Sequence, residues 1–159
     1  MSTRCQVLIT DKYTNPEDSG IMFYRHSDGY PSGVEQSLKE FLNLIKDGYI
    51  RDNCEQAAGW LIMVGNAEYS RPDDEYRGCS SVQELRSKTP DSNISNWKVG
   101  AYEPSVHAFH GDIEYFYVVS LDPIKVTVYS GGWDDKTIKE FLNGKPKGKN
   151  LSLNKPWKD

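Results

Sequence analysis

The chain has 159 residues with a net charge of −4, and 37% of its residues are hydrophobic and 12% aromatic. This composition describes a folded chain of one domain and excludes an intrinsically disordered one. The acidic balance argues against a nucleic-acid binder, because such proteins usually present a basic face.

The cysteines and the apolar runs indicate the cellular compartment in which the protein is expected. Cys5, Cys54 and Cys79 are widely spaced and form no Cys-x-x-Cys pair, so we expect reduced thiols. The longest apolar run, Trp60–Val64, is too short to span a membrane, and no apolar core of a secretory signal follows the N-terminus. We therefore expect a cytoplasmic protein without a membrane partner.

The first two predicted strands are Cys5–Thr10 and Gly20–His26, separated by a polar loop. Two such strands most simply form an antiparallel hairpin. A register in which paired residue numbers sum to about 30 keeps the more apolar side chains on one face. The pairs of the other face are Arg4–His26, Gln6–Tyr24 and Leu8–Met22.

Two helices are predicted after the hairpin. The first is capped by Ser32 and ends at Gly48. Its apolar side chains recur at helical spacing: Val34, Leu38, Phe41, Leu42 and Ile45. The second, Cys54–Val64, is apolar on most sides, which is typical of a buried helix, although its end would also suit a strand.

The second half of the chain begins with a polar excursion, Arg71–Asn96, in which only Val82–Arg86 suggests a short helix. Long loops of this kind are often lids or binding elements. A weak strand signal covers Lys98–Tyr102. Two strong ones, Ile113–Leu121 and Ile124–Ser130, are joined by the turn pair Asp122-Pro123. This hairpin would place Tyr117 opposite Val128 and Val119 opposite Val126.

The predicted elements end with a helix whose apolar positions are Ile138, Phe141 and Leu142. The order is therefore β-β-α-α-β-β-β-α. It predicts an α+β fold, a mainly antiparallel sheet with helices packed on one face. We expect a single domain over residues 1–144 and a basic C-terminal tail over residues 145–159.

Polar side chains are densest in Tyr24–Gly33, where a predicted strand ends and a helix begins. Gly29 would permit a turn with positive φ, and amide groups at the start of the helix would favour an anion such as phosphate. The alternative is an Asp-Gly turn in which His26 bonds to Asp28. The candidate ligand contacts of this region are Arg4, Tyr24, Arg25, His26, Asp28 and Tyr30.

The remaining two histidines, His107 and His110, lie shortly before the second hairpin, close to Asp112. Imidazole and carboxylate groups suit a transition metal, but the spacing is not that of a known metal motif. We therefore predict no metal and no cofactor, and we add His107 and His110 to the ligand-binding residues. The alternative is a surface turn with two exposed histidines.

The run Thr3-Arg4, followed after a strand by Tyr24-x-His26-x-Asp28-Gly29-Tyr30-Pro31 and then Gly33, resembles a group of small bacteriophage and prophage proteins. Gly111-Asp112-Ile113-Glu114-Tyr115 resembles their later strand. The resemblance covers the first third of the chain and the central hairpin. It implies a phage or prophage origin, in which small accessory proteins bind host proteins or sequester nucleotide signals.

These observations favour an accessory protein that binds a small anionic or nucleotide-like ligand at the first hairpin and the start of the first helix. One alternative is a host-directed inhibitor that contacts a host protein through its acidic surface and the loop Arg71–Asn96. Another is a hydrolase or lyase that uses His26, His107 or His110. No P-loop, dinucleotide-binding or nucleophile motif is present, so no catalytic residue is predicted and a non-enzymatic role is favoured.

Overall fold

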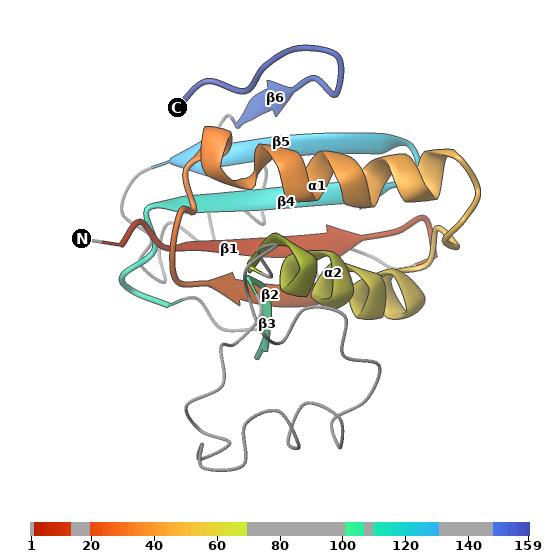
Figure 1. The fold of residues 1–159 in the computed structure, drawn as a ribbon, viewed down its shortest axis with the longest axis horizontal. Helices are drawn as coiled ribbons and strands as arrows, with labels where there is room; N and C mark the ends of the chain where they lie inside the picture. Colours follow the sequence, from red (N-terminus) through yellow and green to blue (C-terminus); the bar gives the residue numbers. More distant parts are fainter. Residues whose placement is uncertain (1, 14–19, 70–100, 107–109, 131–147) are drawn as a thin grey trace.

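The computed structural model describes residues 2–13, 20–69, 101–106, 110–130 and 148–159. They form a six-stranded sheet with two helices on one face (Figure 1). The strands are β1 (Cys5–Thr10), β2 (Ile21–Arg25), β3 (Glu103–Ser105), β4 (Tyr115–Leu121), β5 (Ile124–Ser130) and β6 (Lys149–Leu151). The helices are α1 (Pro31–Lys46) and α2 (Cys54–Tyr69). The α+β class is confirmed.

The strand order across the sheet is β3-β2-β1-β4-β5-β6. The predicted antiparallel character holds for most neighbours but fails at the centre, where β1 and β4 are parallel. Every side chain of β1 is buried, which is typical of a central strand covered on both faces. The sheet is therefore mixed. The helices expected near residues 82–86 and 138–142 lie outside the described residues.

Both predicted hairpin registers are confirmed. In the first hairpin Gln6 lies opposite Tyr24 and Leu8 opposite Met22. In the second, Tyr117 lies opposite Val128, as predicted. Because side chains alternate along a strand, these pairings decide which residues face the helices and which face away.

The main core lies between the sheet and the helices. All five predicted apolar positions of α1 are buried. They pack against strand residues on the helix side of the sheet, among them Val7, Phe23 and Tyr117. A smaller apolar cluster occupies the other face and consists of Leu8, Met22, Ile113 and Phe116.

Helix α2 extends further than predicted and is less buried. Trp60 and Met63 are exposed, at 38% and 57% of their surface. Of the expected strand at Lys98–Tyr102, residues 98–100 lie outside the described residues, and strand β3 begins only at Glu103. Tyr102 is buried in the core, where its hydroxyl lies 2.6 Å from Ser37 Oγ. In the described part of the chain no helix is both long and apolar enough to cross a membrane.

Residues 148–159, expected to belong to a tail outside the domain, are part of the fold. Strand β6 pairs with β5, and Leu151 and Trp157 are buried in the main core. The indole Nε1 of Trp157 donates to the carbonyl of Ser152 at 2.8 Å. The segment was predicted to be a tail because its composition is basic, but its two buried apolar side chains anchor it to the domain.

Candidate functional site

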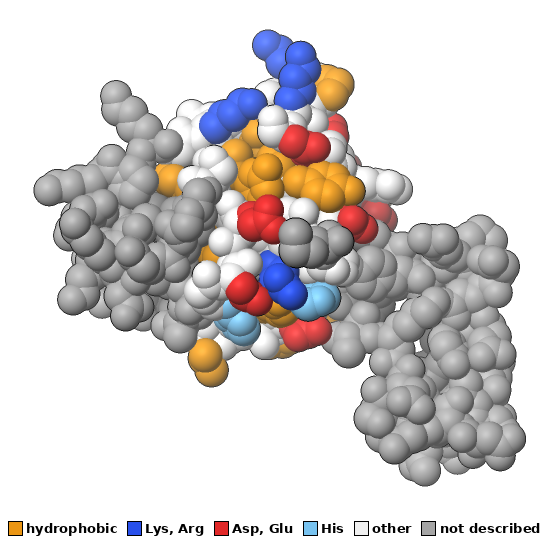
Figure 2. Space-filling model, turned by 90° about the vertical axis from the view of Figure 1, so that its left-hand side faces the viewer, with side chains coloured by type: hydrophobic (Ala, Val, Ile, Leu, Met, Phe, Trp, Pro, Cys, Tyr) orange, Lys and Arg blue, Asp and Glu red, His pale blue; other side chains and the backbone are white. Residues whose placement is uncertain are grey.

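A polar cluster lies on the sheet face opposite the helices, at the end where β1 begins. Figure 2 shows histidine, acidic and basic side chains gathered on this side of the molecule. We call it the Tyr24 cluster. Its members are Arg4, Gln6, Tyr24, His26, Ser105, His110 and Asp112.

Tyr24 is the centre of this cluster. Its ring stacks on the His110 ring, with 4.4 Å between centroids and 17° between planes. Its hydroxyl lies 2.9 Å from Nδ1 of His26. Partial burial, and then the negative charge of Asp112, raise the pKa of Tyr24, while Arg4 opposes this shift. Tyr24 therefore keeps its proton at neutral pH, and its hydroxyl can donate a hydrogen bond to Nδ1 of His26.

Arg4 lies beside this pair of rings. Its Nε is 3.2 Å from Oδ2 of Asp112, and both side chains are partly exposed. The contact is an ion pair without hydrogen-bond geometry, so the buried Nε–H has no acceptor. A charge pair of this exposure contributes little to stability.

The structure brings together four of the predicted site residues: Arg4, Tyr24, His26 and His110. Tyr24 and the two histidines touch directly, although His110 is distant from them in sequence. His107 lies outside the described residues. The alternative arrangement, in which His26 bonds to Asp28, is not found: His26 lies against the hydroxyl of Tyr24, and Asp28 accepts from Tyr30.

Arg25 is separated from the Tyr24 cluster by the sheet. It is fully buried on the helix side. Its Nε donates to the carbonyl of Ser27 at 2.7 Å, and its guanidinium lies 5.1 Å from the Tyr102 ring centroid. Arg25 therefore anchors the loop after β2 and is not exposed to a ligand.

The loop after β2 takes its shape from two neighbouring residues. The positive φ predicted at Gly29 occurs at Asp28 instead, with a value of 55°. Gly29 is needed for another reason, because a Cβ there would lie 2.8 Å from Cβ of Cys5. Asp28 accepts a hydrogen bond from the hydroxyl of Tyr30 at 3.2 Å. These two candidates pair with each other, away from the Tyr24 cluster.

The start of α1 already holds an anion of this chain. The Ser32 amide donates to Oδ1 of Asp159 at 2.8 Å, and the Ser32 hydroxyl donates to Oδ2 at 2.9 Å. The helix begins at Pro31, and its N-cap, Tyr30, makes no side-chain cap, so Ser32 is not the cap that the sequence predicted. The carboxylate of Asp159 meets the preference of a helix N-terminus for negative charge.

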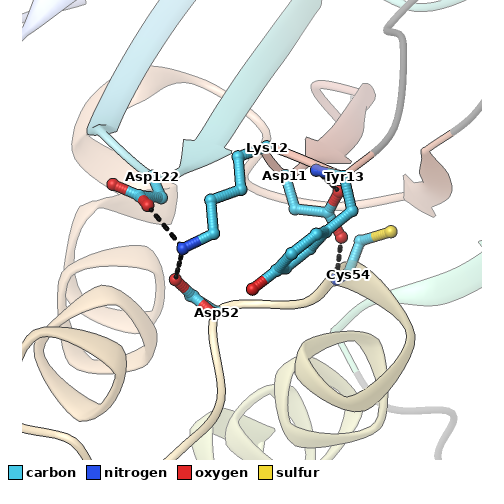
Figure 3. A network of polar contacts seen from close by, with 6 residues as sticks. All are labelled: Asp11, Lys12, Tyr13, Asp52, Cys54 and Asp122. Carbon is cyan, nitrogen blue, oxygen red and sulfur yellow. Dashed lines mark hydrogen bonds and ion pairs between the residues drawn. The ribbon is translucent and has the colours of Figure 1, made fainter.

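A second polar network, which the sequence did not predict, lies where β1 and β4 end (Figure 3). The carboxylate of Asp11 accepts from the amides of Tyr13 at 2.9 Å and Cys54 at 2.7 Å. From its place directly after β1, Asp11 thereby caps the start of α2. The one feature of the sequence that could have indicated this network was an aspartate directly after a buried strand.

Lys12 joins three parts of the chain in this network. Its Nζ lies 3.4 Å from Oδ2 of Asp52 and 3.1 Å from Oδ2 of Asp122. The hydrogen bond to Asp122 is the main cause that raises the pKa of Lys12. A cavity of about 480 Å³ adjoins this network and is lined in part by Tyr13 and Arg51. These contacts fasten the carboxyl ends of β1 and β4 to the loop before α2.

Within the described residues, no three side chains of the histidine, cysteine, aspartate or glutamate type are grouped closely enough to hold a metal ion. The described cysteines, Cys5 and Cys54, are buried reduced thiols. Searches of protein families, curated proteins and solved structures found no match to this chain.

Proposed function

We propose that this protein binds a small anionic ligand with a planar ring, of the nucleotide type, at the Tyr24 cluster. One observation carries the proposal: Tyr24 contacts both its near neighbour His26 and His110 from a distant part of the chain, and Arg4 lies beside them. Guanidinium and imidazole groups are suited to phosphate or carboxylate oxygens, because they donate charge-assisted hydrogen bonds.

The stacked pair of Tyr24 and His110 supports the planar part of the ligand. His110 is exposed, and Tyr24 covers one face of its ring. Bases of nucleotides commonly stack on tyrosine and histidine rings in this way. The resemblance to phage and prophage proteins adds a setting, because such proteins often sequester nucleotide signals.

A second candidate function, contact with a host protein, is favoured by α2. Trp60 and Met63 lie one turn apart on this helix, and both are exposed. Apolar groups gathered at a surface often mark a protein interface. Trp60→Ala separates the two candidates, since it should weaken that contact and leave ligand affinity at the Tyr24 cluster unchanged.

The hydrolase or lyase hypothesis has weaker support. The partner of His26 is the phenol of Tyr24. Because the pKa of this phenol is raised, it stays protonated at neutral pH and cannot accept a proton from His26. A histidine in acid–base catalysis is more often oriented by a carboxylate. Binding without chemistry therefore remains the favoured function.

Isothermal titration with adenosine monophosphate, inorganic phosphate and adenosine tests the proposal. Adenosine monophosphate should bind best, since it alone supplies both the anion and the ring. Arg4→Ala and His26→Ala should each weaken it about tenfold or more, the value of one charge-assisted hydrogen bond. Melting temperatures establish that the variants fold.

Lys125→Ala is the matched control. Lys125 is an exposed cation on the same sheet face, paired with Ser120 at the opposite end of the strands. Its removal changes the net charge equally and should leave affinity within about twofold, because screening weakens distant charges. Equal losses in all three variants, or no binding of any probe, would contradict the proposal.

A further inference from the structure

Gln6 is a buried polar side chain in the middle of an apolar strand. It is fully buried, and its neighbours along β1, Cys5 and Val7, are fully buried as well. An amide in such a place loses its hydration and is retained only where it forms hydrogen bonds. An apolar side chain of the same length would suit the core better, so the amide needs a specific reason.

Two hydrogen bonds connect Gln6 with other members of the Tyr24 cluster. Its Oε1 accepts from the backbone amide of His110 at 3.0 Å. Its Nε2 donates to Oγ of Ser105 at 3.4 Å, and this oxygen lies 3.5 Å from Nε2 of His110. Gln6 therefore holds the His110 backbone directly and reaches its ring through Ser105.

These contacts determine the orientation of the stacked rings. Tyr24 is held by its place opposite Gln6 in the first hairpin, whereas His110 precedes β4 outside any strand. Without the amide of Gln6, two of the bonds that keep the His110 ring over Tyr24 would be lost. The central strand, the edge strand β3 and the segment before β4 all meet at this amide.

We infer that Gln6 is a positioning residue, which holds the His110 ring on Tyr24 in the orientation that the ligand requires. The inference rests on the proposed function of the Tyr24 cluster. Gln6 does not touch the ligand, because its side chain is fully buried. It acts through His110 and Ser105.

The test compares Gln6→Met with the natural protein in three measurements. Methionine has a similar length and no amide, so the fold should persist, and the loss of the two hydrogen bonds should lower the melting temperature only slightly. Stacking on Tyr24 should shift the ring-proton NMR signals of His110 upfield, and Tyr24→Leu provides their unstacked position. In Gln6→Met these signals should move towards the unstacked position, and affinity for adenosine monophosphate should fall about tenfold or more.

Ser105→Ala is the second variant, and it decides the matter if Gln6→Met does not fold. It removes one partner of the amide at a half-buried position, and it should shift the His110 signals part of the way and weaken binding about threefold. A purely structural role of Gln6 would lower the melting temperature and leave the His110 signals and the affinity unchanged. That result would overturn the inference.

The measurements distinguish failure of the proposed function from failure of the inference about Gln6. If no probe binds the natural protein, the proposed function is wrong, and with it the role of Gln6 in binding. If Arg4→Ala and His26→Ala weaken binding while Gln6→Met keeps natural His110 signals and affinity, the proposed function stands and the inference about Gln6 fails.

Discussion

At the scale of single residues, the sheet divides the polar side chains near β2 between two tasks. Tyr24 and His26 lie on the face away from the helices, and the Tyr24 ring stacks there on His110. Arg25 lies on the helix face, where it binds the carbonyl of Ser27 in its own loop. Alternation along the strand thus separates the groups of the Tyr24 cluster from a structural arginine within three consecutive residues.

Tyr117 links β4 to the loop after β2 and offers a test at this scale. Its buried hydroxyl donates to the carbonyl of Gly29 at 2.8 Å. Tyr117→Phe leaves that carbonyl without this donor and should cost about 1–3 kcal/mol of unfolding free energy near neutral pH. Urea unfolding at pH 8 measures the difference.

The stability that Tyr117 contributes through this hydrogen bond should decrease at alkaline pH. Burial raises the pKa of Tyr117 above its ordinary value of 10.0. The protonated phenol therefore contributes stability that is fully present below pH 10 and is lost as the pH rises towards the folded-state pKa. Above pH 10 the gap between the natural protein and Tyr117→Phe should narrow by about 1.4 kcal/mol per pH unit. A gap that stays constant or widens would show that Tyr117 ionises normally in the fold.

At the scale of elements, α1 is held by its apolar side and by the C-terminal segment. Its five predicted apolar positions face the sheet. Its first turn has no side-chain cap of its own and uses Asp159 instead. Trp157, buried two residues earlier, brings this carboxylate to the helix.

Asp159→Ala should therefore lower the unfolding free energy by about 0.5–2 kcal/mol, the range for loss of a helix N-cap. The loss should be smaller at high salt, because the interaction of a charge with a helix terminus is screened. Lys158→Ala, an exposed neighbour, is the control and should have little effect. Urea unfolding at low and high salt makes the comparison, and equal effects of the two changes would refute the role of Asp159.

The same variant separates two anion sites. If the ligand bound at the start of α1, removal of the resident carboxylate would strengthen phosphate binding. Binding at the Tyr24 cluster predicts unchanged affinity in Asp159→Ala.

At the scale of the whole molecule, local patterns predicted the elements better than their assembly. The helical spacing of Val34 to Ile45 and the alternation in both hairpins are properties of short stretches, and they predicted α1 and both registers correctly. The parallel pairing of β1 with β4 could not be predicted, because strand direction depends on the path of the chain between them. Strand β6 was missed because it has only three residues, two of them exposed.

The candidate site was predicted in part for the same reason. The register placed Tyr24 and His26 on one face, and the structure adds His110 from a distant segment. Arg25 was included because its charge suggested exposure, although the same register put it on the other face. Gln6 gave no signal, since a lone amide in a strand has no local pattern that distinguishes a positioning role.

The central claim is that the Tyr24 cluster is the binding site, and NMR titration of the natural protein with adenosine monophosphate tests it most directly. The largest shifts should occur at Arg4, Tyr24, His26 and His110, because these side chains form the proposed binding site. The residues around Asp11 and Lys12, and those at the start of α1, should remain unchanged. Shifts concentrated at either of those places, with none at Tyr24 or His110, would contradict the account.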